Sequence, residues 1–223
     1  MQLTQADHDR VTQAVAAAEA GTDGEIVTVV AGESDAYHDV ALHWAVLGML
    51  LALAVLATWP GLVDTLHTLV ADPWSEAPTT RAALTTALIV AAVAFLLGRI
   101  LFEWRPLRMA LTPRATKARR VRRRAMTLFR ASAEHRTRAR TGVLLYLSLA
   151  EHRAELIADA AIHSKVAPEV WGEAMAALIE RLRDGRPGDG MAEAVARVGI
   201  VLAEHFPRSH DDTNELPDRL IVL

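Results

Sequence analysis

Two carboxylates and one imidazole could form a metal site at the ends of predicted strands. Glu25 opens a β-branched segment, Asp159 closes a second apolar segment, and His163 follows in the next turn. Strand ends of a mixed sheet can converge, and carboxylates with an imidazole can bind a divalent cation such as calcium or magnesium. The alternative interpretation is structural, with Glu25 as a solvated strand end, Asp159 as the cap of a turn and His163 as a surface residue.

No familiar catalytic motif accompanies these three residues. The sequence contains no GxxxxGK[ST] phosphate-binding loop, no HExxH, no GxSxG and no cysteine. The lack of cysteine excludes thiolate chemistry and a disulfide framework. The sequence therefore indicates no catalytic residue and no organic-cofactor site, and it favours a protein without enzymatic activity.

The candidate metal ligands depend on three short predicted strands. Glu25–Ala31 is a β-branched run between two glycines, which is typical of a strand. Val143–Leu149 is almost continuously apolar, as in a strand buried on both faces. The short link to Arg153–Asp159 predicts an antiparallel hairpin. We expect the first strand to lie beside Val143–Leu149, because a lone strand leaves its backbone unpaired.

Helical periodicity surrounds these strands. Residues 4–20 have an amphipathic pattern that begins with a Thr-x-x-Asp capping box. A second helix is predicted from Pro113 to about Arg138, and a third from Pro168. The glycine-rich residues 183–190 break the pattern before a last helix over 191–206.

Two apolar segments of near-membrane length interrupt this α/β pattern. Residues 41–59 and 84–102 would each form a helix of roughly 28 Å, close to the thickness of a bilayer core. Tryptophans lie at or near the segment ends, where interfacial aromatic residues gather: Trp44, Trp59, Trp74 and Trp104. We interpret the segments as a transmembrane hairpin; the alternative is two buried helices of a soluble all-α domain.

Basic residues follow the second apolar segment. Residues 105–124 hold nine Arg or Lys residues, whereas residues 60–81 hold three acidic residues and Arg81 as their one Arg or Lys. Because short flanks rich in Arg and Lys stay cytoplasmic, we expect a multi-pass protein of the inner (plasma) membrane with both termini in the cytoplasm. The basic residues would also attract anionic membrane lipid. No nucleic-acid recognition module is visible, so nucleic acid is not expected as a partner.

The predicted elements form one interrupted domain, because neither flank of the hairpin can close a core alone. Residues 1–32 and 112–207 are expected to form an α/β domain, with a small mixed sheet and flanking helices. The two-helix transmembrane hairpin over 41–102 interrupts this domain. Residues 208–223 form a tail that could add a short extended segment.

Two sequence segments resemble the TPM domain family. TGVLLYLSLAEHRAELIADAAI at 141–162 is similar to its central pattern, in which an apolar strand and an acidic residue before Arg lead to a second strand. GEIVTVV at 24–30 is similar to the family's first strand. The resemblance covers residues 1–31 and about 112–207, and is greatest to bacterial membrane-anchored members. Where many members have a glycine-rich turn after the second strand, this sequence has DAAIH at 159–163.

This resemblance implies an α/β sandwich and suggests three functions. Some relatives are described as acid phosphatases or divalent-metal binders, and others as auxiliary factors for membrane complexes. We favour a membrane-anchored interaction or assembly module with a protein partner in the membrane, since no catalytic signature is present. The second candidate is a metal-dependent acid phosphatase. The third is a small transporter or channel subunit, which the apolar segments disfavour because only His43 and Arg99, both near segment ends, are ionisable. The oligomeric state stays open.

Overall fold

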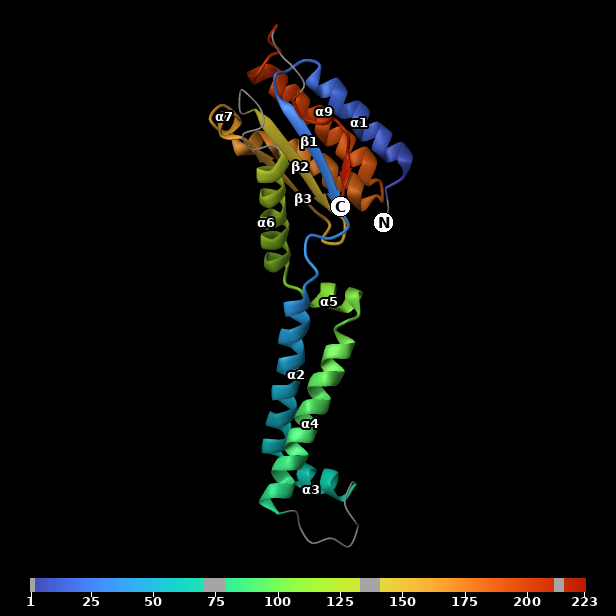
Figure 1. The fold of residues 1–223 in the computed structure, drawn as a ribbon, viewed down its shortest axis with the longest axis vertical. Coiled ribbons are helices and arrows are strands. Elements are labelled where there is room, and N and C mark those ends of the chain that lie inside the picture. The colour runs from blue at the N-terminus through green and yellow to red at the C-terminus, as the bar shows by residue number, and fades with distance from the viewer. Residues whose placement is uncertain (1–2, 70–78, 133–140, 211–214) are drawn as a thin grey trace. The chain divides into compact units, whose positions relative to one another are not determined.

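The computed structural model of the chain describes residues 3–69, 79–132, 141–210 and 215–223. The chain divides into two compact units. The first, which we name the α/β unit, comprises Met1–Asp35 and Arg114–Leu223. The second, the hairpin unit, comprises Ala36–Pro113. Figure 1 shows the strands of the first unit and the paired long helices of the second.

A mixed sheet forms the centre of the α/β unit. Within the described residues it has four strands in the order β3-β2-β1-β4. They are β1 (Glu25–Ala31), β2 (Gly142–Ser148), β3 (Arg153–Ala158) and β4 (Ile221–Val222). β1 runs parallel to β2 and β4, whereas β2 and β3 are antiparallel. The mixed sheet, the pairing of the first two strands and the β2–β3 hairpin are confirmed, and the tail supplies β4.

Helices cover both faces of this sheet (Figure 1). One face packs against α1 (Gln5–Glu19), α8 (Gly172–Arg183) and α9 (Pro187–His205). The other face packs against α6 (Arg114–Ser132). The short α7 (Ala160–His163) and the 3-10 helix η1 (Pro168–Trp171) connect β3 to α8. An α/β fold with a small mixed sheet and flanking helices is therefore confirmed.

The sequence of β1 explains why helices pack on both faces of the sheet. Ile26 and Val30 belong to the core with α1, α8 and α9, whereas Val27 and Val29 pack with α6. This alternation arises because successive side chains of a strand point to opposite faces. All seven residues of β1 are buried, including Glu25 and Thr28. β2 is also buried throughout, as its almost continuously apolar run predicts.

The last helix begins earlier than expected, at Pro187 and not after residues 183–190. A proline suits the first helical turn, where its missing N–H has no helical partner to lose. Gly188 and Gly190 consequently lie inside the helix, at points of close contact. A Cβ on Gly190 would lie 2.9 Å from the carbonyl oxygen of Leu178. These glycines let α9 approach its neighbours, and the interpretation of the whole segment as a helix breaker was wrong.

Two other helices differ from the predicted pattern. The helix expected from Pro168 is divided into the 3-10 helix η1 and α8. The helix expected from Pro113 begins at Arg114 and is described as far as Ser132. Its predicted continuation to Arg138 lies outside the described residues.

Long apolar helices dominate the hairpin unit. Its described helices are α2 (His38–Thr58), α3 (Gly61–Thr68), α4 (Thr80–Leu101) and α5 (Arg105–Leu111). α2 and α4 are each long and apolar enough to cross a membrane, and they begin three and four residues before the predicted segments at 41 and 84. The short α3 and α5 were not predicted, because so few turns give no clear periodicity. Trp74 lies outside the described residues.

Small residues bring α2 and α4 together. A Cβ on Gly98 would lie 3.1 Å from the Cα atom of Ala45, so the missing side chain permits close backbone contact. Ala45 is fully buried. The rings of Trp44 and Phe102 lie 6.2 Å apart, which joins the same two helices near Gly98.

Candidate functional site

Glu25 holds the C-terminal segment against the sheet. The residue is 4% exposed, so it is not the solvated strand end of the alternative interpretation. Its carboxylate accepts hydrogen bonds from the backbone N–H groups of Glu215 and Leu216, each at 3.2 Å. Charge-assisted bonds of this kind are among the stronger ones in proteins. The geometry therefore gives Glu25 a structural role at the start of β1.

Glu19 was missed by the sequence analysis and lies beside Glu25. A small cavity of about 150 Å³ has Glu19, Glu25, Arg208 and Asp218 among its lining residues. Burial raises the pKa of Glu19 from 4.5 to about 8, against the hydrogen bond that its carboxyl accepts from the N–H of Ile26 at 2.7 Å. The carboxylates of Glu25 and Asp218 raise this pKa further. Glu19 is thus protonated near neutral pH, which removes a charge from an acidic cluster.

Asp159 is the N-terminal cap residue of α7 and is 5% exposed. Its Oδ2 atom accepts a hydrogen bond from the N–H of Gly142 at 3.3 Å. His163 is exposed at the end of α7. Asp159 and His163 line the same groove, which Glu25 does not line.

The three predicted metal ligands are therefore only partly brought together. Glu25 lies opposite Gly142, and Gly142 lies in turn opposite Asp159. Since neighbouring strands are about 4.8 Å apart, the backbones of Glu25 and Asp159 are separated by roughly 10 Å. Within the described residues, no group of three His, Asp or Glu side chains is arranged to hold a metal ion. Cation binding by Glu25, Asp159 and His163 stays a prediction.

A groove of about 700 Å³ runs beside β3. We name it the β3 groove; its lining residues come from α6, β3, α7, η1 and α8. Arg122 on α6 pairs with Glu155 on β3 at 3.6 Å. Burial raises the pKa of Glu155, and the positive charges of Arg122 and Arg153 oppose this rise. The groove combines a partly buried strand, apolar side chains and two arginines of α6, Arg122 and Arg130.

A closed polar network lies at the other end of the sheet, beyond the carboxyl ends of β1 and β2. The side chain of Glu151 accepts hydrogen bonds from the N–H of Ser34 at 3.0 Å and from the hydroxyl of Ser148. The hydroxyl of Ser34 contacts those of Tyr146 and Ser148, each at 2.9 Å. Burial raises the pKa of Tyr146.

Ligands often bind at the carboxyl ends of parallel strands, but here the polar groups bind one another. The network anchors the segment after β1 to the β2–β3 turn. The sequence analysis missed it, although the acidic residue before Arg in the resemblance pattern is Glu151.

Residues 106–201 match the family model of the TPM domain. This match covers less than half of the chain and identifies residues 106–201 as a TPM-type segment. The NMR structure of BA42 protein from the psychrophilic bacterium Bizionia argentinensis is similar, with a TM-score of 0.57 and 17% sequence identity. That similarity covers 100% of this chain and 97% of the other, and at such identity it shows the fold alone. No protein with a curated description matches the chain.

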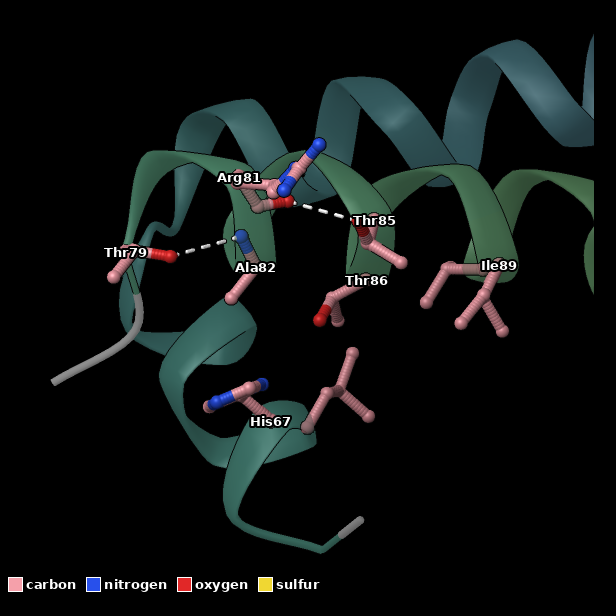
Figure 2. Close-up of a pocket in the computed structure, with 9 residues that line it drawn as sticks. His67, Thr79, Arg81, Ala82, Thr85, Thr86 and Ile89 are labelled. Carbon is pink, nitrogen blue, oxygen red and sulfur yellow. Dashed lines mark hydrogen bonds between the residues drawn. The ribbon is translucent and has the colours of Figure 1, made fainter. Parts of the chain in front are cut away.

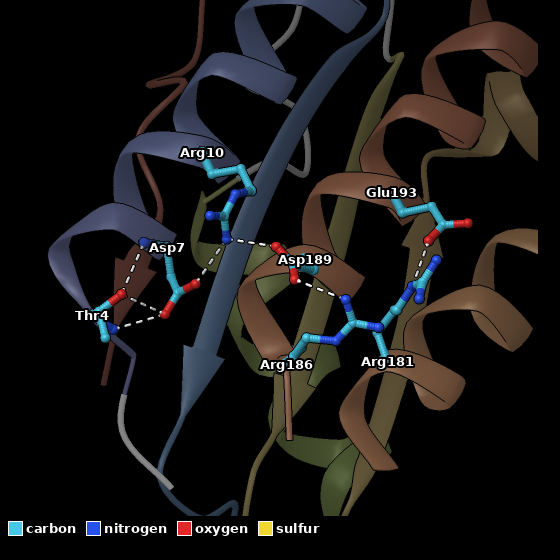
Figure 3. Close-up of polar contacts among 7 residues, drawn as sticks. All are labelled: Thr4, Asp7, Arg10, Arg181, Arg186, Asp189 and Glu193. Carbon is cyan, nitrogen blue, oxygen red and sulfur yellow. Dashed lines mark hydrogen bonds and ion pairs between the residues drawn. The ribbon is translucent and has the colours of Figure 1, made fainter. Parts of the chain in front are cut away.

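The family match begins after β1, so tertiary structure joins the first strand to the TPM domain. Ionic contacts at the start of α1 help to hold this N-terminal part in place (Figure 3). Arg10 pairs with Asp7 at 3.1 Å and with Asp189 of α9 at 2.6 Å. Hydrogen bonds from the backbone and side chain of Thr4 lower the pKa of Asp7 and form the predicted capping box.

The TPM domain presents a strongly basic helix. α6 contains eight Arg or Lys residues and no carboxylate. Arg120 pairs with Asp35 at 2.9 Å, and Arg122 pairs with Glu155 at 3.6 Å. α6 therefore gives this part of the domain a positive charge, which can attract anionic groups.

A second cavity belongs to the hairpin unit. Its volume is about 520 Å³. Figure 2 shows His67 of α3 and the first turns of α4, which line it. Thr79 accepts a hydrogen bond from the N–H of Ala82 and so caps α4, while Thr85 donates to the carbonyl of Arg81. The hydroxyls of Thr79 and Thr85 are therefore engaged with the backbone of α4.

Proposed function

We propose that the protein is a membrane-anchored interaction or assembly module of the bacterial inner membrane. The main support for this proposal is that the two long apolar helices, α2 and α4, are largely exposed. In the most apolar window of α4 only 6% of the residues are buried, and in that of α2 22%. A core helix of a soluble protein is mostly buried. A lipid environment gives these surfaces the apolar contact that water does not.

The ends of the hairpin support one orientation of this anchor. Trp59 and Trp104 are 60% and 64% exposed at the two ends, where tryptophan prefers the membrane interface. The nine basic residues of 105–124 favour the cytoplasm at the end of α4, and they would bind anionic lipid headgroups. The proposal therefore places the loop between α2 and α4 outside and both termini in the cytoplasm.

The polar clusters of the TPM domain support interaction over catalysis. The carboxylate of Glu25 binds backbone N–H groups, Asp159 accepts from Gly142, and Glu151 closes a network with two serines. Groups engaged in this way stabilise the fold and are poorly placed as a nucleophile or general base.

The interaction role predicts a stoichiometric protein partner in the membrane. The tagged full-length chain would be cross-linked in cells, purified in detergent from membranes and identified with its partners by mass spectrometry. A partner recovered at a fixed ratio, and lost from the hairpin unit expressed alone, supports the proposal. Recovery of the chain without any protein at a comparable amount would contradict it.

A metal-dependent acid phosphatase is the second candidate, supported by Asp159 and His163 on one groove. Calcium and magnesium titrations by calorimetry and a phosphatase assay would compare the wild type with Asp159→Asn. Metal-dependent hydrolysis lost in the variant would establish the enzyme and displace the interaction role. Binding without hydrolysis would indicate a structural cation.

A further inference from the structure

β3 is the outer strand of the sheet among the described residues. The N–H of Asp159 donates to the carbonyl of Gly142 at 2.9 Å, which makes these residues a hydrogen-bonded pair. In antiparallel strands such pairs alternate with pairs that direct their backbone groups outward. Ala154 and Leu156 therefore direct N–H and C=O groups away from β2, and both residues are only partly buried. Edge groups of this kind can pair with another strand.

The β3 groove gives an added strand two different walls. The α8 side is apolar, with Trp171, Met175 and Ile179. The indole nitrogen of Trp171 is buried and has no hydrogen-bond partner among the described residues. The α6 side contributes Met126 and Phe129 together with arginine side chains. An extended segment points alternate side chains to opposite faces, so one set would face α6 and the other α8.

The positive charge on the α6 side of the groove indicates which side chains an added strand should carry. Of the eight basic residues of α6, Arg122 and Arg130 line the groove, and α6 contributes no carboxylate to it. Arg122 pairs with Glu155 on the groove floor. Acidic side chains therefore suit the α6 side, and apolar side chains suit the α8 side.

We infer that the β3 groove binds an extended segment of a protein partner with alternating acidic and apolar residues, which pairs with β3 as an added strand. The inference rests on the proposed interaction function and names its surface. Main-chain hydrogen bonds to Ala154 and Leu156 provide affinity, and the two walls provide specificity.

The first test measures peptide binding to the full-length protein in nanodiscs of neutral lipid. The probe is a fluorescent heptapeptide of alternating glutamate and valine, followed by anisotropy. Ala154→Pro removes an outward N–H and leaves the β2–β3 ladder intact, whereas Ala154→Val keeps the N–H. We expect Ala154→Pro to weaken binding by about tenfold or more, and Ala154→Val to bind like the wild type.

Control peptides test the same inference on the wild-type protein, so their result does not depend on whether a variant folds. A lysine–valine peptide and a fully N-methylated glutamate–valine peptide should both fail to bind wild-type protein. Arg122→Gln should weaken binding by about threefold, while Arg119→Gln, which removes the same charge from α6 outside the groove, should change little. Binding of the N-methylated peptide, or no binding of the glutamate–valine peptide, overturns the inference.

A second measurement separates this inference from the proposed function. The membrane purification is repeated with Ala154→Pro and Ala154→Val. Loss of the partner from the proline variant alone supports the β3 groove. Equal recovery with both variants refutes the groove and leaves the interaction module standing. If wild-type membranes yield no stoichiometric partner, the proposed function fails and this inference fails with it.

Discussion

The α/β unit buries its apolar side chains, whereas the hairpin unit exposes many of them. β1 and β2 are completely buried between two helical layers. By contrast, sixteen of the twenty large apolar side chains that are exposed among the described residues belong to the hairpin unit. Both units are rich in Leu, Val and Ala, so composition does not distinguish them. The difference is that the first unit provides its own apolar partner, whereas the second requires one from its surroundings.

The two units also differ in how their ionisable side chains are paired. In the α/β unit buried carboxylates such as Glu25 and Asp159 bind backbone N–H groups. In the two long helices of the hairpin unit, Arg99 pairs with Glu103 one turn away and His43 contacts the carbonyl of Asp39. Glu25 and Asp159 are thus compensated within the fold, whereas Arg99 and His43 lie near the ends of their helices.

The largest expected effect concerns which parts of the two units reach the cell exterior. The chain has no native cysteine, so single cysteines can be labelled without background. An impermeant maleimide added to intact cells should label Asp64→Cys in α3 and should not label Leu223→Cys. Both should react after permeabilisation. Labelling of Leu223→Cys in intact cells would reverse the proposed orientation.

A buried charge in the sheet should destabilise the whole α/β unit. Val143 is fully buried on β2, between β1 and β3. Val143→Asp should lower the free energy of unfolding by about 3 kcal/mol or more, because the new carboxylate has no partner there. Ile200→Asp, at a position 70% exposed on α9, is the matched control and should cost little. Chemical denaturation in detergent measures both, and equal midpoints would contradict the described core.

The stability of the α/β unit should decrease with rising pH through the titration of Glu19. Its pKa is about 8 in the folded protein and 4.5 without the fold, so the folded state holds an extra proton between these values. The free energy of unfolding should therefore fall from pH 4.5 to pH 8 and then level off, by about 2 kcal/mol or more.

Glu19→Gln keeps the size and the acceptor oxygen but does not titrate. Its unfolding free energy should lose this part of the pH dependence, as measured by denaturant melts at pH 5.5 and 8.5. The same slope in both proteins would show that another group is responsible.

The smallest expected effect tests helix packing in the hairpin unit. Gly98→Leu should weaken the contact of α2 with α4 by about 1–3 kcal/mol, because its side chain would meet the backbone of Ala45. Gly48→Leu has open space around it and is the matched control. Cross-linking of cysteines placed at Trp44 and Phe102 reports the contact. Equal yields in the two leucine variants would contradict the described packing.

Local patterns predicted much of the secondary structure. The β-branched run at Glu25, the apolar run at Val143 and the short link between β2 and β3 indicated strands and a hairpin, because pleat and turn length leave few alternatives. Glycine was harder to interpret. Gly188 and Gly190 look like breakers in sequence, yet they lie inside α9 because neighbouring elements approach too closely for a Cβ atom.

The candidate site was less predictable than the fold. Asp159 and His163 are near in sequence and do line one groove. Glu25 binds Glu215 and Leu216, contacts that span about 190 positions and leave no local signal. The pKa of Glu19 likewise depends on burial and on Glu25 and Asp218, which no spacing rule reveals.

The sequence by itself determined the three longer strands, most of the long helices, the apolar length of the two hairpin helices and the concentration of basic residues after them, because periodicity, length and charge are local properties. Tertiary structure decided the parallel pairing of β1 with β2, the network at Ser34 and Glu151, and the place of β3 as the outer strand among the described residues, beside arginines of α6. These features arise when segments far apart in the chain compete for the same backbone hydrogen bonds and apolar surface. Only the folded arrangement shows which pairs form.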